Sequence, residues 1–287
     1  IAEQEAKQFI QIIEDSLEYQ FGYNHSTAYS MNGYACVRLR TYYPLQFVTA
    51  YLNRAENTED TINGVNLAKQ LNIIIKPILF GKSRSKYTFD LKENTIYKGI
   101  ESIKWCNSQI ADELYSLAQQ KQYTKSAEGF IDLLLDIQSN TSVNSRQLKI
   151  LTILNFFIEF GKNKKLLQCI ELFESLAYRN QLNQKQIQEF NINESILIKH
   201  TGKKTEKLYK DLDMIGYIKE VIKNIEDKSL SIKEQVKYEL EYLEYTRYIN
   251  EKAGKNFYII TEYKTYKDIT KPYVTLRQIK TGNEIKT

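Results

Sequence analysis

The stretch from residue 19 to residue 44 holds the side chains that most suggest chemistry. It carries His25 and Tyr29 near its start and Arg38 and Arg40 farther on. Backbone N–H groups at the start of a helix attract anions, and nearby cations strengthen the attraction. A helix starting near His25 therefore suits the phosphates of a nucleoside triphosphate. The structural alternative is that His25 caps the helix, Tyr29 packs in a core and both arginines are solvated.

Helical periodicity dominates the first 250 residues that surround and follow this stretch. Apolar residues recur at helical spacing in three early segments, which predicts three apolar stripes that face a core. These stripes are Ala6, Phe9, Ile10, Ile13 and Leu17; then Ala28, Met31, Ala35, Leu39 and Tyr42; then Ile62, Val65, Ala68 and Leu71. Pro44 is expected to end the second helix. Further helices are predicted at about 107–120, 127–138, 145–157, 163–177, 205–226 and 232–250.

Strand patterns occur in two places. Residues 72–80 favour a β conformation, and residues 87–100, broken at 92–94, suggest a hairpin. From Phe257 the pattern changes to a period of two and predicts two or three antiparallel strands. So few strands are marginally stable alone, so either helices cover them or the domain continues. The predicted class is a mainly α protein with a short C-terminal antiparallel β segment.

The composition excludes several classes. The chain has 287 residues and a formal net charge of +5, which permits nucleic-acid binding without requiring it. No apolar run approaches the roughly 18 residues that cross a bilayer, and the start does not read as a secretory signal. Three separated cysteines and two histidines argue against a zinc site or a disulfide framework, which fits a cytoplasmic protein. The first residue is Ile1, so we expect a processed or excised piece of a longer chain.

The stretch from 19 to 44 also resembles a family motif. In bacterial replicative DNA polymerases of the C family, the polymerase III alpha subunits, F-x-x-S-H-A-x-A-Y-S opens a long fingers helix that closes with a basic residue and H-Y-P. Here Phe21 to Ser30 and Arg40 to Pro44 fit that spacing without a gap. The resemblance implies that His25, Tyr29, Arg38 and Arg40 bind the incoming nucleotide. Tyr23 stands where the family has a lysine, which removes one cation from the expected phosphate site.

Two further blocks follow in the family's order. Residues 72–77 and 96–104 resemble G-I-x-V-L-P-P-D and I-R-Y-G-L-G-A-I-K, and residues 143–148 and 159–163 resemble V-N-K-R-V-L and E-F-G-K-N. The C-terminal strands resemble the opening of an OB domain, which normally needs five strands. The resemblance therefore implies four regions: fingers at 1–104, degenerate tandem helix-hairpin-helix at 105–175, a helical connector at 176–255, and an incomplete OB-like start at 256–287.

The hairpin region departs from the family. Residues 105–107 read Trp-Cys-Asn where the family has G-V-G, a turn in which glycine lets backbone N–H groups approach a DNA phosphate. Asn155 replaces a second glycine, although asparagine tolerates the left-handed conformation. DNA binding would then rely on side chains, and the candidates are Lys104, Asn107, Arg146, Lys162, Lys164 and Lys165. The alternative is that the cations among them are solvated surface groups.

The resemblance also has implications for the partners and the metal of the protein. Gln186 to Phe190 reads Q-I-Q-E-F, similar to the extended peptide by which replicative polymerases bind the sliding clamp, although short patterns of this kind arise often by chance. The family's P-D-x-D-x-D-F motif, whose palm carboxylates hold magnesium, does not occur in the sequence. We therefore expect no catalytic or metal-binding residue in this chain, which alone would be inactive. DNA and a deoxynucleoside triphosphate are the expected partners.

Two other interpretations stay open. One is a non-catalytic module derived from the fingers that binds DNA or a protein partner, which the altered hairpin favours. A helical interaction protein without a nucleic-acid role is the third. The divergence from the family motifs suggests a phage source for the polymerase interpretation.

Overall fold

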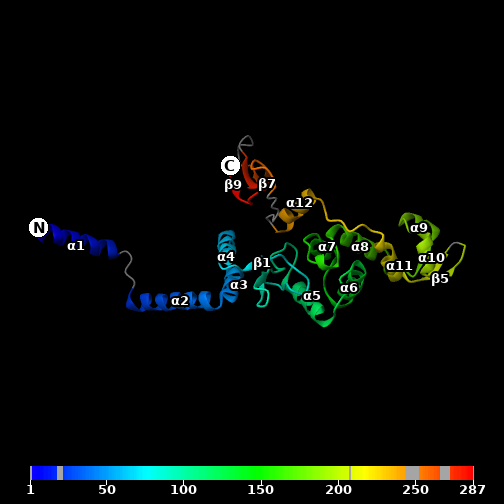
Figure 1. Cartoon of the computed structure of the whole chain (residues 1–287), viewed down its shortest axis with the longest axis horizontal. Helices are drawn as coiled ribbons and strands as arrows, with labels where there is room; N and C mark the ends of the chain where they lie inside the picture. The colour runs from blue at the N-terminus through cyan, green and yellow to red at the C-terminus, as the bar shows by residue number, and fades with distance from the viewer. Residues whose placement is uncertain (1, 18–21, 207, 244–251, 266–271, 287) are drawn as a thin grey trace. The chain divides into compact units, whose positions relative to one another are not determined.

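The computed structural model describes residues 2–17, 22–206, 208–243, 252–265 and 272–286. It is mainly helical and contains three small three-stranded sheets, one of them near the C-terminus (Figure 1). The predicted fold class is therefore confirmed. Contacts between Cα atoms divide the chain into two compact units, 1–74 with 89–96 and 75–88 with 97–287. The region boundaries predicted after residues 104, 175 and 255 stay predictions.

The first unit holds four helices, α1 (Ala2–Leu17), α2 (Tyr23–Tyr42), α3 (Pro44–Arg54) and α4 (Thr58–Gln70). Pro44 does more than end α2, because it occupies the first turn of α3, where its fixed φ suits a helix start. The buried apolar side chains of these helices belong to α3 and α4: Leu45, Val48, Leu52 and Ala68. Residues 19–21, which open the motif, lie outside the described part of the chain.

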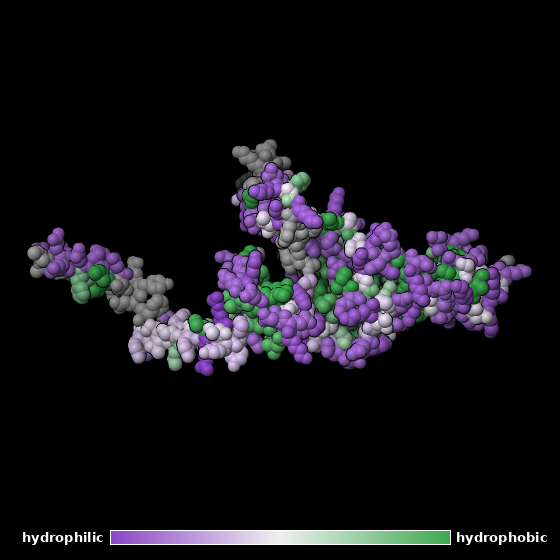
Figure 2. All heavy atoms as spheres, viewed as in Figure 1, coloured by the Kyte–Doolittle hydropathy of each residue, from purple (hydrophilic) through white to green (hydrophobic). Residues whose placement is uncertain are grey.

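The apolar stripes of α1 and α2 do not face a core. Phe9 on α1 is 65% exposed and Met31 on α2 is 69% exposed, and no residue of α2 is buried. Figure 2 shows apolar side chains of α1 as green spheres at the surface. The prediction that these two stripes are core is wrong for the described residues, because periodicity fixes the face of a helix but not its partner.

The first sheet confirms the predicted hairpin. Its strands are β1 (Ile74–Lys76), β2 (Thr88–Asp90) and β3 (Thr95–Tyr97), in the order β1-β3-β2. The break predicted at 92–94 is a turn in which the Asp90 carboxylate accepts hydrogen bonds from the backbone N–H groups of Lys92 and Glu93. Asn94 then takes a left-handed φ of 49°.

The main core lies in the second unit. Its longer helices are α5 (Ser108–Gln120), α6 (Ala127–Asn140), α7 (Ser145–Ile153), α8 (Asn163–Leu176), α11 (Met214–Lys223) and α12 (Ile232–Leu243), with a short 3-10 helix η1 (Ile158–Phe160). Asn107, Ser126 and Asn144 cap α5, α6 and α7 with side-chain oxygens that accept first-turn N–H groups. Aromatic rings fill the core, as in the contacts of Phe130 with Phe157 and Phe160.

A second sheet occupies part of the predicted helical connector. It comprises β4 (Gln181–Asn183), β5 (Thr201–Lys204) and β6 (Leu208–Leu212) in the order β4-β6-β5, and it accompanies α9 (Gln184–Glu189) and α10 (Glu194–Lys199). The helix predicted over 205–226 is therefore wrong in its first half. Tyr209 and Leu212 are buried side chains of strand β6. The helix begins only at Met214, and Asp213 caps it.

The C-terminal strands confirm the predicted antiparallel segment. They are β7 (Tyr258–Lys264), β8 (Tyr273–Gln278) and β9 (Glu284–Lys286), which pair in sequence order. Their likeness to an OB domain stays a prediction, and the end of the helix expected at 232–250 falls outside the described residues. None of the helices in the described ranges is long and apolar enough to span a bilayer.

Candidate nucleic-acid interface

The start of α2 places two of the predicted nucleotide-binding residues together. The rings of His25 and Tyr29, one turn apart, lie 4.4 Å between centroids. Gly22 precedes the helix without a side-chain cap, and its carbonyl accepts the N–H groups of His25 and Ser26. No side chain caps the first turn, which lies at the positive end of the helix dipole.

The two arginines lie at the other end of the same helix. With a rise of 1.5 Å per residue, Arg38 is about 20 Å along the axis from His25. At roughly 100° per residue, Arg40 falls about 60° from the direction of His25 and Arg38 about 140° from it. The structure thus brings His25 and Tyr29 together but not His25 and Arg38, and Arg40 is the arginine on the side of His25.

The predicted DNA-binding residues near α5 surround an unusual backbone turn. Trp105 has a φ of 70°, a left-handed value that costs a residue with a side chain about 1–2 kcal/mol. Its carbonyl accepts a hydrogen bond of 3.0 Å from Nε2 of Gln147, and the N–H of Lys104 donates to the carbonyl of Tyr242 at 3.1 Å. Asn107, predicted to contact DNA, instead accepts the N–H of Ile110 and caps α5.

Arg146 lies directly against the tryptophan of this turn. Its guanidinium carbon is 3.9 Å from the centroid of the Trp105 ring. Arg146 is the second residue of α7, whose start is fixed by a reciprocal capping box between Asn144 and Gln147. Of the predicted residues, Arg146 contacts this exposed indole and Lys104 directly precedes Trp105 in the chain, and sequence reasoning gave no role to Trp105 itself.

The second predicted hairpin keeps its left-handed backbone. Asn155 has a φ of 66°, which agrees with the expectation that asparagine can replace glycine there. The turn anchors the core, because the N–H of Phe156 donates to the carbonyl of Leu151 and the carbonyl of Phe156 accepts the N–H of Phe80. These two backbone hydrogen bonds attach the hairpin to the core.

The other predicted cations cluster at the start of α8 beside carboxylates. The N–H of Lys162 donates to Asp227 at 2.8 Å. The charge of Lys164 contributes to a lowered pKa of Glu234, whose first cause is a hydrogen bond from Ser231, and Lys165 contributes likewise at Glu128. Acidic neighbours therefore offset the positive charge at this end of α8, which the sequence alone did not reveal.

The predicted clamp-binding residues both have structural roles. Residues 184–189 form α9, in which the side-chain oxygen of Gln186 accepts the N–H of Asn183 in a capping box. Phe190 is half-buried against the core, and the guanidinium of Arg179 lies 4.3 Å from its ring. A clamp that takes an extended peptide would have to unfold α9 to reach them, and clamp binding stays a prediction.

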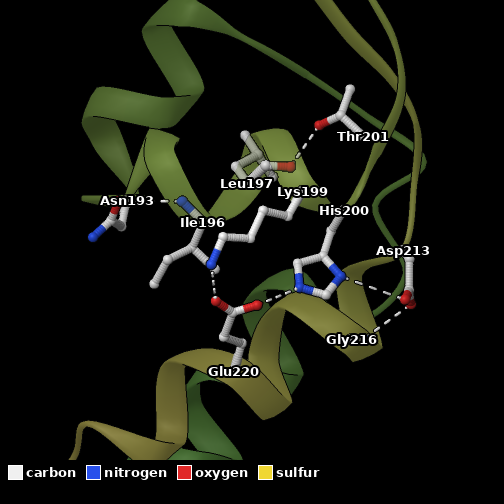
Figure 3. Close-up of polar contacts among 9 residues, drawn as sticks. All are labelled: Asn193, Ile196, Leu197, Lys199, His200, Thr201, Asp213, Gly216 and Glu220. Carbon is white, nitrogen blue, oxygen red and sulfur yellow. Dashed lines mark hydrogen bonds and ion pairs between the residues drawn. The ribbon is translucent and has the colours of Figure 1, made fainter.

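A polar cluster that sequence reasoning missed joins α10 to α11 (Figure 3). His200 donates from Nε2 to Glu220 at 3.0 Å, and its Nδ1 lies 3.6 Å from Asp213. The pKa of the Glu220 carboxyl is lowered most by a hydrogen bond from Lys199 and next by one from His200. Gly216 leaves room for the ring, because a Cβ there would approach Nδ1 to 2.7 Å. The spacing of these residues gave no signal, since the contact spans 20 positions.

The comparisons with known proteins agree with the resemblance seen in the motifs. No protein-family model matches the chain. The DNA polymerase III subunit alpha of Campylobacter jejuni is 25% identical over 219 residues, which is 71% of this chain and 17% of that protein. The subunit of Bacillus subtilis is 27% identical over 219 residues, 76% of this chain and 19% of that protein. The subunit of Ureaplasma parvum is 28% identical over 170 residues, 58% of this chain and 17% of that protein.

The chain thus spans less than a fifth of the length of these curated relatives. The similarity extends over more than half of the chain in each case. It therefore includes residues beyond the opening motif, as the three ordered blocks predict. The chain is related in sequence to the alpha subunit of bacterial DNA polymerase III.

Proposed function

We propose that the chain is the fingers and DNA-binding portion of a polymerase III alpha-like subunit that serves template-directed DNA synthesis. The observation that carries this proposal is the similarity to DNA polymerase III alpha over as much as 76% of the chain. The exposed surface of α2 and the cationic turn around Trp105 support it, because both present charge or polar groups outward.

In this proposal the start of α2 receives the phosphates of the incoming deoxynucleoside triphosphate. The positive end of the helix dipole and the imidazole of His25 are placed there, whereas Arg38 lies near the negative end, which disfavours anions. His25 is therefore the first phosphate contact and Tyr29 holds its ring. Arg40 lies on the same side of α2 as His25 but still farther along the axis than Arg38, so neither arginine reaches a phosphate held at the first turn.

Nucleotidyl transfer itself requires carboxylates that hold magnesium. Among the described residues, no group of three or more His, Cys, Asp or Glu side chains could hold a metal ion. The residues here do not fit that role, so we assign no step of metal chemistry to them. We place the magnesium ligands in other sequence of the polymerase, and the work of this chain is binding and positioning.

A second candidate function is that of a DNA-binding or partner-binding module without a role in catalysis. The observation that favours it is Trp105, a bulky side chain in the left-handed turn where the family carries glycine. A phosphate cannot approach this backbone as closely as it approaches glycine. Duplex held through side chains alone would be bound more weakly, which suits a module better than a processive polymerase.

The DNA-binding role is tested by the salt dependence of binding. The intact chain is titrated into a fluorescently labelled primer–template duplex at several salt concentrations, and anisotropy gives the dissociation constant. Each neutralised phosphate should contribute about −0.9 to the slope of log K against log salt concentration. We expect a slope of about −2 from the two cations of the Trp105 turn, Lys104 and Arg146, since acidic neighbours offset the cations of α8. A slope near zero would remove DNA from the proposal.

The two candidates differ in nucleotide binding. A fingers segment should bind a deoxynucleoside triphosphate at α2, whereas a module used only for DNA or a partner has no need to do so. Calorimetric titration of the intact chain with the triphosphate therefore separates them. Saturable heat that disappears in His25→Ala favours the fingers, and no heat in either protein favours the module.

A further inference from the structure

The turn at Trp105 is built to present a flat aromatic ring at the surface. Trp105 is 60% exposed although it is a large apolar residue, and its backbone is left-handed. Such a conformation in a bulky residue persists only where the surroundings impose it. Gln147 holds the carbonyl of Trp105, and Tyr242 holds the N–H of Lys104 on the preceding residue.

The surroundings of the ring extend it into a strip of aromatic and cationic groups. Arg146 lies 3.9 Å from the indole centroid. Tyr242 is joined to this turn through its carbonyl, which accepts the N–H of Lys104 at 3.1 Å. Tyr242 in turn stacks on Tyr238 of α12, with ring planes 5° apart and centroids 6.0 Å apart. We call Trp105, Tyr242 and Tyr238 the aromatic strip.

Aromatic rings interleaved with cations are how proteins bind single-stranded nucleic acid, since every base offers a π face. A base inside a duplex has both faces covered by its neighbours, whereas an unpaired base has a face to offer. Phosphate does not stack on an aromatic ring, but it pairs well with the cations of Arg146 and Lys104. The combination fits a single strand better than a duplex.

We propose that the aromatic strip binds single-stranded DNA, with an unpaired base stacked on Trp105 and its phosphates against Arg146 and Lys104. The inference rests on the DNA-binding role proposed above and adds the strand state and the contact. The Trp105 side chain binds a base at the position where the family's glycine turn binds a duplex phosphate through backbone N–H groups.

The chain offers a direct probe, because Trp105 is its only tryptophan. The intact chain is titrated with an oligothymidine of about 12 nucleotides, within the site size of single-strand binders, while tryptophan emission is recorded. Stacking should quench the emission in a saturable way. An abasic strand of equal length carries the same phosphates without bases and should leave the emission nearly unchanged.

Variants separate the ring from the fold. Trp105→Gly suits the left-handed backbone, so it keeps the turn while it removes the ring. By anisotropy it should weaken binding of the labelled oligothymidine by about 5- to 150-fold, the range for losing one stacked base. Trp105→Phe should retain most of the affinity. Tyr178→Ala removes a side chain that is 64% exposed elsewhere in the same unit and should have no effect.

The outcomes distinguish this inference from the DNA-binding role beneath it. Duplex binding with a normal salt slope, together with unquenched emission or unchanged affinity in Trp105→Gly, would overturn the strip and leave that role standing. Equal quenching by the abasic strand would overturn base stacking in the same way. Absence of binding to both duplex and single strand would overturn the DNA-binding role and the strip together.

Discussion

The side chain of Asn163 is hydrogen-bonded to the backbone of Leu230, with 2.8 Å between Oδ1 and the Leu230 nitrogen. Its Nδ2 donates to the carbonyl of Ile153 at 3.1 Å and to Gln235 at 2.9 Å. Asn163 is only 2% exposed. One buried amide therefore connects the end of α7, the segment before α12 and α12 itself, the helix that carries two residues of the aromatic strip.

Replacing this amide should destabilise the second unit. Asn163→Leu keeps the volume but leaves the buried N–H of Leu230 and the carbonyl of Ile153 without partners. Each unsatisfied group costs about 1–3 kcal/mol, so the free energy of unfolding should fall by about 3 kcal/mol. Urea unfolding measures the change. Lys164→Ala, at the exposed neighbouring position, is the control, and an equal small effect of both variants would show that the amide is not a structural link.

The turn at Asn155 gives a second, backbone-level prediction. Because its φ is 66°, Asn155→Gly should change the free energy of unfolding by less than about 1 kcal/mol. Asn155→Val places a β-branched residue in a left-handed conformation and should cost about 2–3 kcal/mol. Thermal unfolding of both variants tests this. If valine is tolerated as well as glycine, the left-handed turn is not required in solution.

The two hairpins show what the sequence can predict. The sequence indicated that asparagine tolerates a left-handed backbone at position 155, and Asn155 has such a backbone, because turn geometry is local. The predicted helices at 107–120 and 163–177 are found with nearly the same limits, since apolar spacing, with an Asn cap for the first of them, defines them locally. The sequence was enough to predict the structure of these segments, because their own residues determine it.

The failures concern partners distant in the chain. Leu208, Tyr209 and Leu212 have a spacing that fits a helix, but pairing of β6 with β4 and β5 makes them a strand. His200 meets Glu220 through the packing of α10 on α11, which no motif predicts. Of the proposed site, sequence reasoning named the cations, which stay predictions, but not Trp105, because exposure and backbone conformation are tertiary properties.

The carboxyl of Glu220 predicts a dependence of stability on pH. Its pKa is lowered from the ordinary value of 4.5 by hydrogen bonds from Lys199 and His200. A group with a lowered folded pKa contributes stability that is present above 4.5 and is lost as the pH falls through the folded pKa. Glu220→Gln should therefore have a lower melting temperature than the unmodified chain at pH 7. The difference between the two melting temperatures should disappear under acid conditions.

The measurement for Glu220 is thermal unfolding at a series of pH values. Glu189→Gln removes an exposed carboxylate of neighbouring α9 and serves as the matched control, with the same charge change. A gap between Glu220→Gln and the unmodified chain that persists unchanged below the folded pKa would mean that glutamine fails there for steric reasons. The ionised pair would then not be the source of the stability.

The geometry of α2 ranks the predicted nucleotide contacts. A charge-assisted hydrogen bond is worth about 1.5–3 kcal/mol, so His25→Ala should raise the dissociation constant of a deoxynucleoside triphosphate by about 10- to 150-fold. Arg38, about 20 Å away along the axis and on another side of the helix, cannot reach a phosphate at the first turn. Arg38→Ala is therefore the matched control on the same helix, and Arg40→Ala, at a position still farther along the axis, should likewise have little effect. Calorimetric titration of each variant gives the order, and an effect of Arg38→Ala larger than that of His25→Ala would move the phosphates to the C-terminal end of α2, against the helix dipole.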